Sequence, residues 1–303
     1  MKNKFLAAVI MLLMISSAAG PAVYAEDTAA KNELQIFVSQ TSGDDEKSGT
    51  ADAPVKSIGK AKELARGQKD KIVTILVDQG DYYENISFHE EDKRSVECPL
   101  TIRAQENHHV RLIGAQKVSA VSAVPVSDSS VRSRIPEEAQ DKVLQINLKE
   151  QGVEEYGEIV PINFGQLSLA PPELFINNSA MTLARWPNSE YARIESVVGK
   201  TEDSFSFTAM DAVDHVKRWA NAKDVWAYGF WYWDWANAGV SLTKIDAQSG
   251  AMTAASKEDV RAGQRFYVYN LLEELDTANE FYLDRETGTV SYTHLTLPTT
   301  SRV

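Results

Sequence analysis

The stretch Ile72-Val73-Thr74-Ile75-Leu76-Val77 decides the fold class of this chain. Five of its six residues are β-branched, and Thr74 is the polar one. Branched side chains favour strands because they pack well on a pleated surface. An apolar run without alternation is typical of a strand that is buried on both faces, as in a parallel sheet. The stretch therefore predicts a central strand of a parallel sheet.

The segments on either side of this strand extend the β-rich pattern. Residues 34–39 predict an earlier strand, and residues 41–50 are dense in turn formers. Residues 58–66 predict a short helix that Ser57 caps, with apolar residues at helical spacing. Residues 86–88, 100–103 and 110–113 predict short strands separated by turns. Short strands at even spacing favour a β-solenoid or another all-β architecture.

The composition of the sequence changes at about Lys117, where a stretch rich in Ser and Val without clear periodicity begins. We expect a second β-rich module from this point. Residues 143–148 alternate with Leu144, Ile146 and Leu148 on one face, as in a half-buried strand. The further strand predictions are residues 173–175, 180–184, 205–207, 225–230, 240–245, 265–270 and 281–283. Residues 211–221 predict one or two helical turns.

Several phrases of this sequence occur together in one group of secreted bacterial proteins. They are Phe37-Val38-Ser39 with Gly43-Asp44-Asp45 and Gly49-Thr50, Gly80-Asp81-Tyr82-Tyr83, Pro172-Glu173-Leu174-Phe175-Ile176-Asn177, Leu183-Ala184-Arg185-Trp186-Pro187-Asn188, Gly229-Phe230-Trp231-Tyr232-Trp233-Asp234-Trp235, residues 266–276 and residues 281–288. In this collinear order, over residues 34–289, the chain resembles right-handed parallel β-helix proteins similar to glycoside hydrolase family 141.

The resemblance implies an all-β fold that begins a right-handed parallel β-helix and includes a short N-terminal helix. It implies a β-helix start over residues 26–116, a β-rich insertion domain over 117–275, and a return to the β-helix over 276–289. It further implies that the catalytic carboxylates lie on later coils, outside this chain. The expected activity is glycoside hydrolysis of a complex polysaccharide.

The first 25 residues predict a secretory signal peptide. Lys2 and Lys4 form a basic start, residues 5–15 are apolar, and Val23-Tyr24-Ala25 resembles a cleavage site. The alternative, a membrane anchor, needs about 20 apolar residues, and this run is shorter. We therefore expect cleavage after Ala25, a secreted protein, and no membrane association after cleavage.

We expect residues 290–303 to come from DNA outside the native gene. The run from Val290 to Thr299 can be back-translated as a DNA string that resembles the adapter of transposase-based sequencing libraries. The alternative is a Thr-rich strand and tail. Under the adapter interpretation the native frame continues beyond Thr289.

Composition excludes several classes of protein. The 303 residues carry a formal charge of −12, so an acidic surface repels nucleic acid. One cysteine excludes a disulfide framework, and we expect Cys98 to be a small buried hydrophobe. The sequence contains no metal-ligand spacing, phosphate loop or nucleophile elbow. We expect no metal and no cofactor, and the expected partner is a poly- or oligosaccharide.

Trp231, Trp233, Asp234 and Trp235 form the most unusual stretch. Strand alternation would place the three tryptophans on one face, where their rings could stack on sugars. The alternative is that they fill the core of a small β-module. Under either interpretation, Asp234 could fix a loop or bind a sugar hydroxyl.

Arg185 and Trp186 pair a guanidinium with an aromatic ring. Arg185 could hold a uronic acid in a two-pronged contact. The alternative is a structural contact between guanidinium and ring.

Three acidic residues, Glu273, Glu274 and Asp276, could line a site, but no acidic residues in the sequence form a recognisable catalytic pair. Three functions therefore remain open: a glycoside hydrolase, a polysaccharide lyase on the same scaffold, and a non-catalytic carbohydrate-binding or surface protein.

Overall fold

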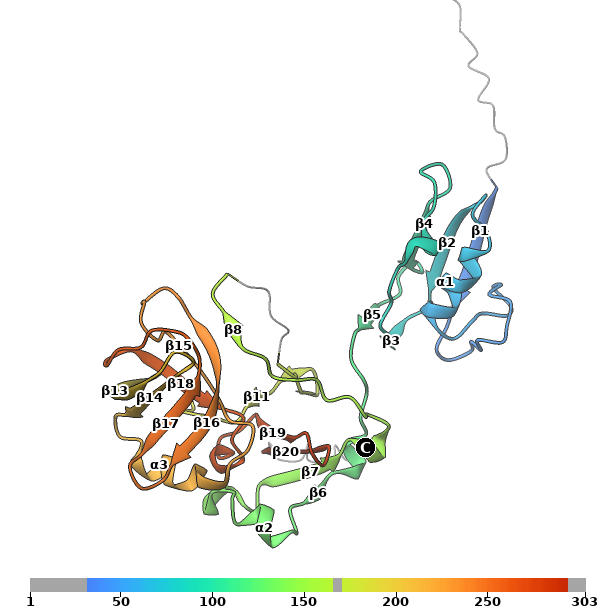
Figure 1. Ribbon diagram of the computed structural model, residues 1–303. Coiled ribbons are helices and arrows are strands. Elements are labelled where there is room, and N and C mark those ends of the chain that lie inside the picture. The colour runs from blue at the N-terminus through green and yellow to red at the C-terminus, as the bar shows by residue number, and fades with distance from the viewer. Residues whose placement is uncertain (1–31, 166–170, 294–303) are drawn as a thin grey trace, which may run out of the picture. The chain divides into compact units, whose positions relative to one another are not determined.

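The computed structural model describes residues 32–165 and 171–293, and the chain divides into two compact units, 1–116 and 117–303 (Figure 1). Strands dominate and the helices are few and short, which confirms the mainly-β prediction. The predicted signal segment 1–25 and residues 294–303 lie outside the described residues. Within the described part of the chain, no helix has the length and hydropathy to cross a membrane.

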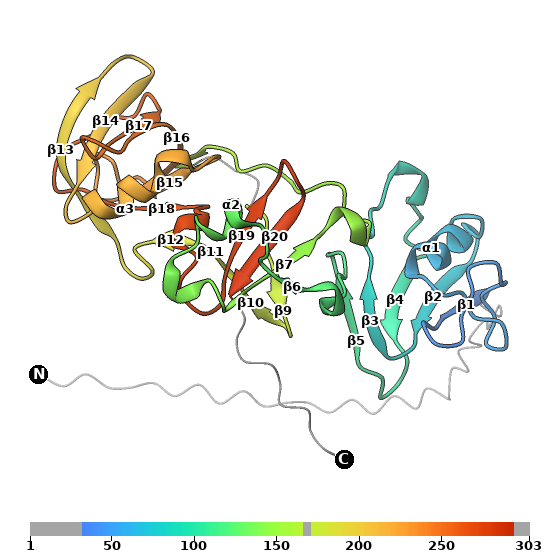
Figure 2. The same ribbon diagram turned by 90° about the horizontal axis from the view of Figure 1, so that it is seen from below.

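The first unit contains a three-stranded parallel sheet in the order β1 (Glu33–Val38), β2 (Ile72–Val77), β4 (Leu100–Ala104). The prediction for the central strand is confirmed, because β2 pairs in parallel on both edges. Helix α1 (Ile58–Arg66) lies beside this sheet (Figure 2) and contributes to the same apolar core. The core consists of Ile36, Val38, Val55, Ile58, Ala61, Ala65, Val73, Ile75, Val77 and Tyr82.

Helix α1 begins where the sequence predicts it. The Ser57 hydroxyl accepts a 3.0 Å hydrogen bond from the backbone N–H of Lys60. The carboxylate of Glu84 accepts the N–H groups of Ile58 and Gly59 at 2.9 and 2.8 Å. A side-chain cap and a carboxylate at the first turn satisfy backbone donors that a helix leaves unpaired.

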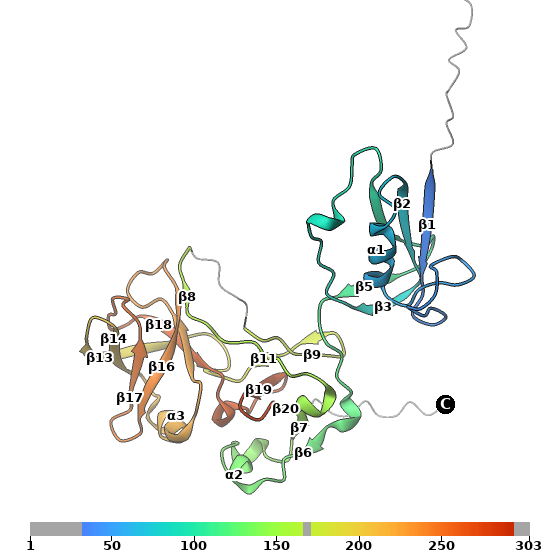
Figure 3. The ribbon, with the colours of Figure 1, turned by 45° about the vertical axis from the view of Figure 1, so that its right-hand side comes forward.

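A second parallel pair in the first unit joins β3 (Gly80–Tyr83) to β5 (Val110–Ile113) (Figure 3). Strand β3 follows β2 in the chain, and β5 follows β4, so two successive segments take parallel paths. A 3-10 turn, η1 (Glu90–Asp92), lies between them in sequence. Cys98 in the same stretch is half-buried, so the prediction of a buried residue there is wrong. It lies in a surface turn before β4 rather than within a strand.

The second unit contains a closed antiparallel barrel. Its six strands are β13 (Ala192–Lys200), β14 (Ser204–Ala209), β17 (Ala251–Ala255), β16 (Ala238–Asp246), β15 (Trp226–Gly229) and β18 (Arg265–Tyr269). The ring closes because β18 pairs with both β13 and β15. Short strands β12 (Arg185–Trp186) and β8 (Ile162–Asn163) extend this sheet. This barrel does not itself show a parallel β-helix.

Large aromatic side chains fill the barrel. Phe205, Phe207, Trp231 and Phe266 are buried, and the ring of Trp231 contacts the rings of the other three. Gly229 lets β15 approach β18 closely, since a Cβ there would lie 2.6 Å from that of Phe266. Helix α3 (Val213–Arg218) and the 3-10 turn η5 (Trp219–Asn221) contribute Val216 and Trp219 to the same core.

A five-stranded sheet forms the rest of the second unit. Its order is β11 (Thr182–Leu183), β19 (Glu280–Asp284), β20 (Thr289–Thr293), β7 (Val143–Asn147), β6 (Val124–Pro125). The short pair β9 (Phe175–Ile176) and β10 (Ser179–Ala180) turns through Asn177 and Asn178. The remaining short elements are α2 (Ser129–Arg132), η2 (Ala120–Ser122), η3 (Glu137–Ala139), η4 (Lys149–Gln151) and η6 (Leu272–Glu274).

Strand β20 includes the first four residues that the adapter interpretation assigns to foreign DNA. Val290 and Tyr292 are buried against Phe281 and Leu283 of β19. The origin of these residues remains a prediction about the gene.

The chain passes from the five-stranded sheet to the barrel sheet between β11 and β12. Leu183 in β11 pairs with Phe281 in the five-stranded sheet, whereas Arg185 in β12 pairs with Tyr269 in the barrel sheet. Between them, the carbonyl of Ala184 accepts a 3.3 Å hydrogen bond from the N–H of Leu271. The chain therefore enters and leaves the barrel at adjacent positions.

Candidate functional site

A cleft of about 230 Å³ lies where three segments of the second unit converge. The loop after β12, helix α3 and the segment around η6 supply its walls. The lining residues are Trp186, Pro187, Asn188, Ser189, His215, Glu274 and Asp276.

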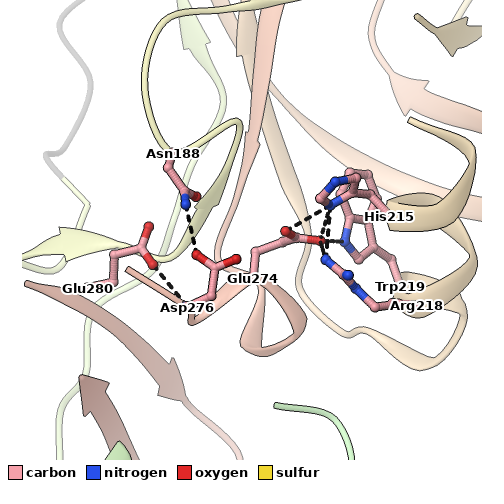
Figure 4. A network of polar contacts seen from close by, with 7 residues as sticks. All are labelled: Asn188, His215, Arg218, Trp219, Glu274, Asp276 and Glu280. Carbon is pink, nitrogen blue, oxygen red and sulfur yellow. Dashed lines mark hydrogen bonds and ion pairs between the residues drawn. The ribbon is translucent and has the colours of Figure 1, made fainter. Parts of the chain in front are cut away.

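Glu274 is the centre of the polar network at this cleft (Figure 4) and is fully buried. Its carboxylate accepts hydrogen bonds from Trp219 Nε1 at 2.6 Å, Arg218 Nη2 at 2.8 Å and His215 Nδ1 at 2.9 Å. Burying a carboxylate is costly unless a cation and several donors compensate it. These three contacts supply that compensation, so the Glu274 side chain is fully engaged within the protein.

The network fixes the ring of His215. Its Nδ1 atom lies 2.9 and 3.0 Å from the two carboxylate oxygens of Glu274, and Arg218 Nη2 lies 3.0 Å from the same nitrogen. These contacts hold the imidazole at the cleft, beside the ring of Trp186.

A contact between Asn188 and Asp276 joins the loop after β12 to the segment that follows η6. Asn188 Nδ2 donates to Asp276 Oδ1 at 2.8 Å and to Thr277 Oγ1 at 2.6 Å. These bonds hold the loop after β12 against the segment that follows η6. They place a carboxylate and an amide, both able to bind hydroxyl groups, on the cleft wall.

Glu280 lies next to this network and is 3% exposed (Figure 4). Burial raises the pKa of its carboxyl to about 7, against the lowering effect of a hydrogen bond from the N–H of Thr277. Asp276 also donates its N–H to Glu280, at 3.3 Å. The region thus contains two buried acidic side chains, and burial raises the pKa of Glu280 to about 7.

Of the residues predicted from sequence, Trp186, Glu274 and Asp276 line this cleft, whereas Arg185 and Glu273 are not among its lining residues. The ring of Trp186 lines it and contacts the rings of His215 and Trp219, at centroid distances of 5.1 and 5.7 Å. Arg185 donates to the carbonyls of Pro187 and Glu190, at 2.8 and 2.6 Å. Its guanidinium also lies 3.8 Å from the ring centre of Tyr267. The geometry supports the structural interpretation of Arg185, because these contacts shape the loop.

The aromatic stretch divides into a core residue and an exposed loop. Trp231 is 1% exposed and donates Nε1 to the carbonyl of Ala238 at 3.1 Å. Trp233 and Trp235 are 56% and 63% exposed. The expectation that all three share one face of a strand is wrong, because β15 ends at Gly229 and the chain bends through residues 231–235. The bend lets one ring enter the barrel while the other two face solvent.

Contacts with its neighbours order the exposed loop. Trp235 meets the edge of Phe164 at a centroid distance of 5.0 Å. Asp234 accepts from Arg261 Nη2 at 3.2 Å, and its carbonyl accepts from Arg265 Nη2 at 3.0 Å. The loop therefore presents two indole rings beside a carboxylate and a guanidinium.

The sequence interpretation missed His215 and Asn188. Asn188 belongs to the Arg185-to-Asn188 phrase that the resemblance had already marked. His215 lies three and four residues before Arg218 and Trp219, the spacing that places side chains on one helix face. That spacing could have indicated that the three side chains form one cluster.

Comparison with known proteins gives a likeness of fold. No family profile and no curated protein sequence matches the chain. A solved structure described as a glycoside hydrolase is similar, with a TM-score of 0.55 and 19% identity over 85% of this chain. The match spans 43% of that structure's length. The structure of XylC with xylose gives a TM-score of 0.27 and 13% identity over 83% of this chain and 33% of that one; a score this low supports no argument.

Proposed function

We propose that this chain is the N-terminal part of an exported carbohydrate-active enzyme, a glycoside hydrolase that acts on a complex polysaccharide. The observation that carries the proposal is the likeness of fold to a glycoside hydrolase over 85% of this chain. The chain spans less than half of that structure, so the proposal concerns the longer protein.

The parallel pairing in the first unit supports the finer assignment to a β-helix similar to glycoside hydrolase family 141. Strand β2 pairs in parallel with β4, and strand β3 pairs in parallel with β5. Successive segments that repeat the same path are the unit from which a solenoid is built. The barrel lies within the proposed insertion domain of residues 117–275, which also includes β6, β7 and β11 of the five-stranded sheet.

The catalytic pair of this proposed enzyme lies on later coils. Hydrolysis needs an acid and a second carboxylate about 5–5.5 Å apart for retention, or about 6.5–9.5 Å apart for inversion. Glu274 is buried under three donors and so cannot attack a sugar carbon. We assign substrate binding rather than bond cleavage to the cleft that Trp186 and Asn188 line.

The proposal is tested on the whole gene. The source DNA is amplified outward from the codon of Thr289, and the complete frame is expressed and incubated with a panel of plant and bacterial polysaccharides. Release of reducing sugars supports a hydrolase. Release of unsaturated uronates would replace it by a lyase. A complete protein that degrades none of the panel while binding one would favour the non-catalytic alternative.

The non-catalytic alternative has one observation of its own, the exposed rings of Trp233 and Trp235. Exposed indoles that are held in place can stack on the apolar faces of sugars. Co-sedimentation with insoluble polysaccharide tests it, with Trp233→Ala and Trp235→Ala against Phe175→Ala as a matched exposed aromatic elsewhere. Loss of binding in the tryptophan variants alone supports a binding surface, and unchanged binding excludes it.

A further inference from the structure

The apolar interior of the first unit is covered at one end and open at the other. Its strands pair in register, so Ile36 of β1 lies beside Ile75 of β2, and Ile75 lies beside Ile102 of β4. Ile36 and Ile75 are 3% and 0% exposed, whereas Ile102 is 37% exposed. In the second pair, Tyr82 of β3 is fully buried and its partner Leu112 of β5 is 55% exposed. The side chain on the last strand of each sheet therefore lacks the cover that its partner has.

The edge of β1 is closed by the chain itself. The N–H of Phe37 donates to the carbonyl of Gly49 at 2.8 Å, and the carbonyl of Phe37 accepts from the N–H of Val55 at 3.0 Å. Residues 49–55 thus occupy the place that a further strand would take beside β1. An edge whose backbone groups are already bonded cannot add a strand, so the sheet is closed on this side.

The outer edges of β4 and β5 are open. Strand β4 is the last of its sheet, with β2 between it and β1 (Figure 2), and within residues 32–165 and 171–293 no strand pairs with the outer edge of β4 or β5. The N–H of Gln105 donates to Val77 in β2, and the carbonyl of His109 accepts from Gly80 in β3. Backbone groups along a strand alternate between its two edges, so those of Ile102 and Leu112 face outward.

These open edges specify the chemistry of what covers them. The outward N–H and C=O groups pair with an extended segment, and the half-exposed side chains of Ile102 and Leu112 gain from apolar residues placed over them. In the first unit each strand pairs in parallel with a later segment of the same chain, β1 with β2, β2 with β4 and β3 with β5. Two further strands of the same polypeptide continue this arrangement.

A second copy of the chain fits the open edges less well. A head-to-tail copy would bring its β1 edge to β4, and that edge is covered by residues 49–55. A two-fold copy would pair β4 with its own equivalent in antiparallel fashion, against the parallel pairing of this unit. The solved structure of similar fold is matched over only 43% of its length, which leaves ample chain for further strands in a longer protein.

We propose that the outer edges of β4 and β5, with Ile102 and Leu112, form the docking surface for two strands that follow β20 in the longer protein. The proposal rests on the proposed function only in treating this chain as part of a longer polypeptide. It requires that the chain return from the second unit, which contains β20, to the first unit.

Hydrogen exchange of backbone amides compares this chain with the complete protein expressed from the extended frame. We expect the amides of Ile102 and Leu112 to exchange at least about a hundredfold more slowly in the complete protein, because docked strands accept their N–H groups. The amide of Ile75 lies between two paired strands and should be protected in both proteins, so it is the internal control.

Lysine variants test the apolar part of the docking surface. Ile102→Lys and Leu112→Lys should each lower the melting temperature of the complete protein by at least about 5 °C, because a charge is buried under the docked strands. In this chain alone the shift should be much smaller, since both side chains already meet solvent. Val96→Lys is the matched control, because Val96 is 91% exposed and lies outside β4 and β5.

Four results would overturn the proposal. The amides of Ile102 and Leu112 exchange equally in both proteins, or Ile102→Lys and Val96→Lys give complete proteins of equal melting temperature. Protection that grows with the concentration of this chain alone would assign the surface to a second copy. A native frame that encodes no further strands would leave the surface without this occupant.

Failure of the proposed function is distinguishable from failure of the docking surface. A complete protein whose edge amides are protected but which hydrolyses no polysaccharide retains the docking surface and loses the assigned activity. An active hydrolase whose edge amides exchange as fast as in this chain retains the activity and loses the docking surface.

Discussion

Trp219 donates its indole N–H to Glu274 Oε1 at 2.6 Å, and both side chains are buried. Trp219 belongs to the barrel core, whereas Glu274 lies in η6, the turn through which the chain leaves the barrel. One hydrogen bond thus joins the core of the barrel to the segment that carries the cleft.

Removing the acceptor of this bond should destabilise the second unit. Glu274→Ala is expected to lower the free energy of unfolding by about 3 kcal/mol, because it leaves the buried N–H of Trp219 unpaired and separates Arg218 from its partner. Trp219→Phe keeps the ring and removes the donor, so a smaller loss of about 1–2 kcal/mol is expected. Urea unfolding measures both, and a change below about 0.5 kcal/mol in Glu274→Ala would contradict the role assigned to the network.

Glu280 should make stability depend on pH. The pKa of its carboxyl is about 7 in the folded chain and 4.5 for an ordinary glutamate. Between these values the unfolded chain releases the proton first, so the folded chain binds more protons and stability falls as pH rises. The loss between pH 4.5 and 7 is about 3 kcal/mol.

Glu280→Gln cannot titrate and should flatten this part of the profile. Denaturant unfolding of both proteins from pH 4 to 8 checks it. If the two curves stay parallel across that window, Glu280 ionises normally.

The three neighbouring tryptophans should behave differently on truncation. Trp231→Ala is expected to cost about 3–5 kcal/mol, because it leaves a cavity among Phe205, Phe207 and Phe266. Trp233→Ala and Trp235→Ala remove exposed rings and should change stability by about 0.5 kcal/mol or less. Thermal unfolding distinguishes the two classes, and a large loss in Trp233→Ala would show that the loop supports the barrel.

Gly43 should tolerate no side chain. A Cβ at this position would lie 2.2 Å from the carbonyl oxygens of Ser39 and Val55, and backbone atoms cannot move aside. Gly43→Ala is therefore expected to destabilise the first unit by about 3 kcal/mol. Gly114→Ala is the matched control, because its Cβ would meet nothing within 4 Å. Equal melting temperatures for the two variants would refute the close approach.

Local sequence pattern predicted many of the individual elements, although the strand expected at residues 86–88 does not form and β13 was not predicted. The β-branched run at 72–77 forms β2, and the capped segment at 58–66 forms α1 with the same bounds. Both depend on interactions within a few residues, which a sequence displays directly. The alternating segment at 265–270 likewise contains β18.

Long-range pairing was beyond the pattern. Closure of the barrel depends on the pairing of β15 with β18, and the sequence of neither strand indicates which strand it pairs with. The aromatic stretch misled because alternation assumes a continuing strand, whereas the chain bends after Gly229. The cleft was hidden for a related reason, since Asn188, His215 and Glu274 converge from three distant segments.

The adjacent entry and exit of the barrel strands have an evolutionary consequence. Because Ala184 and Leu271 are hydrogen-bonded neighbours, the intervening segment can be removed with its flanking ends already in reach of each other. Insertions and deletions within the intervening segment can therefore leave the pairing of β11 with β19 in place. The loops of the barrel can therefore vary while the strands of the five-stranded sheet keep their pairing.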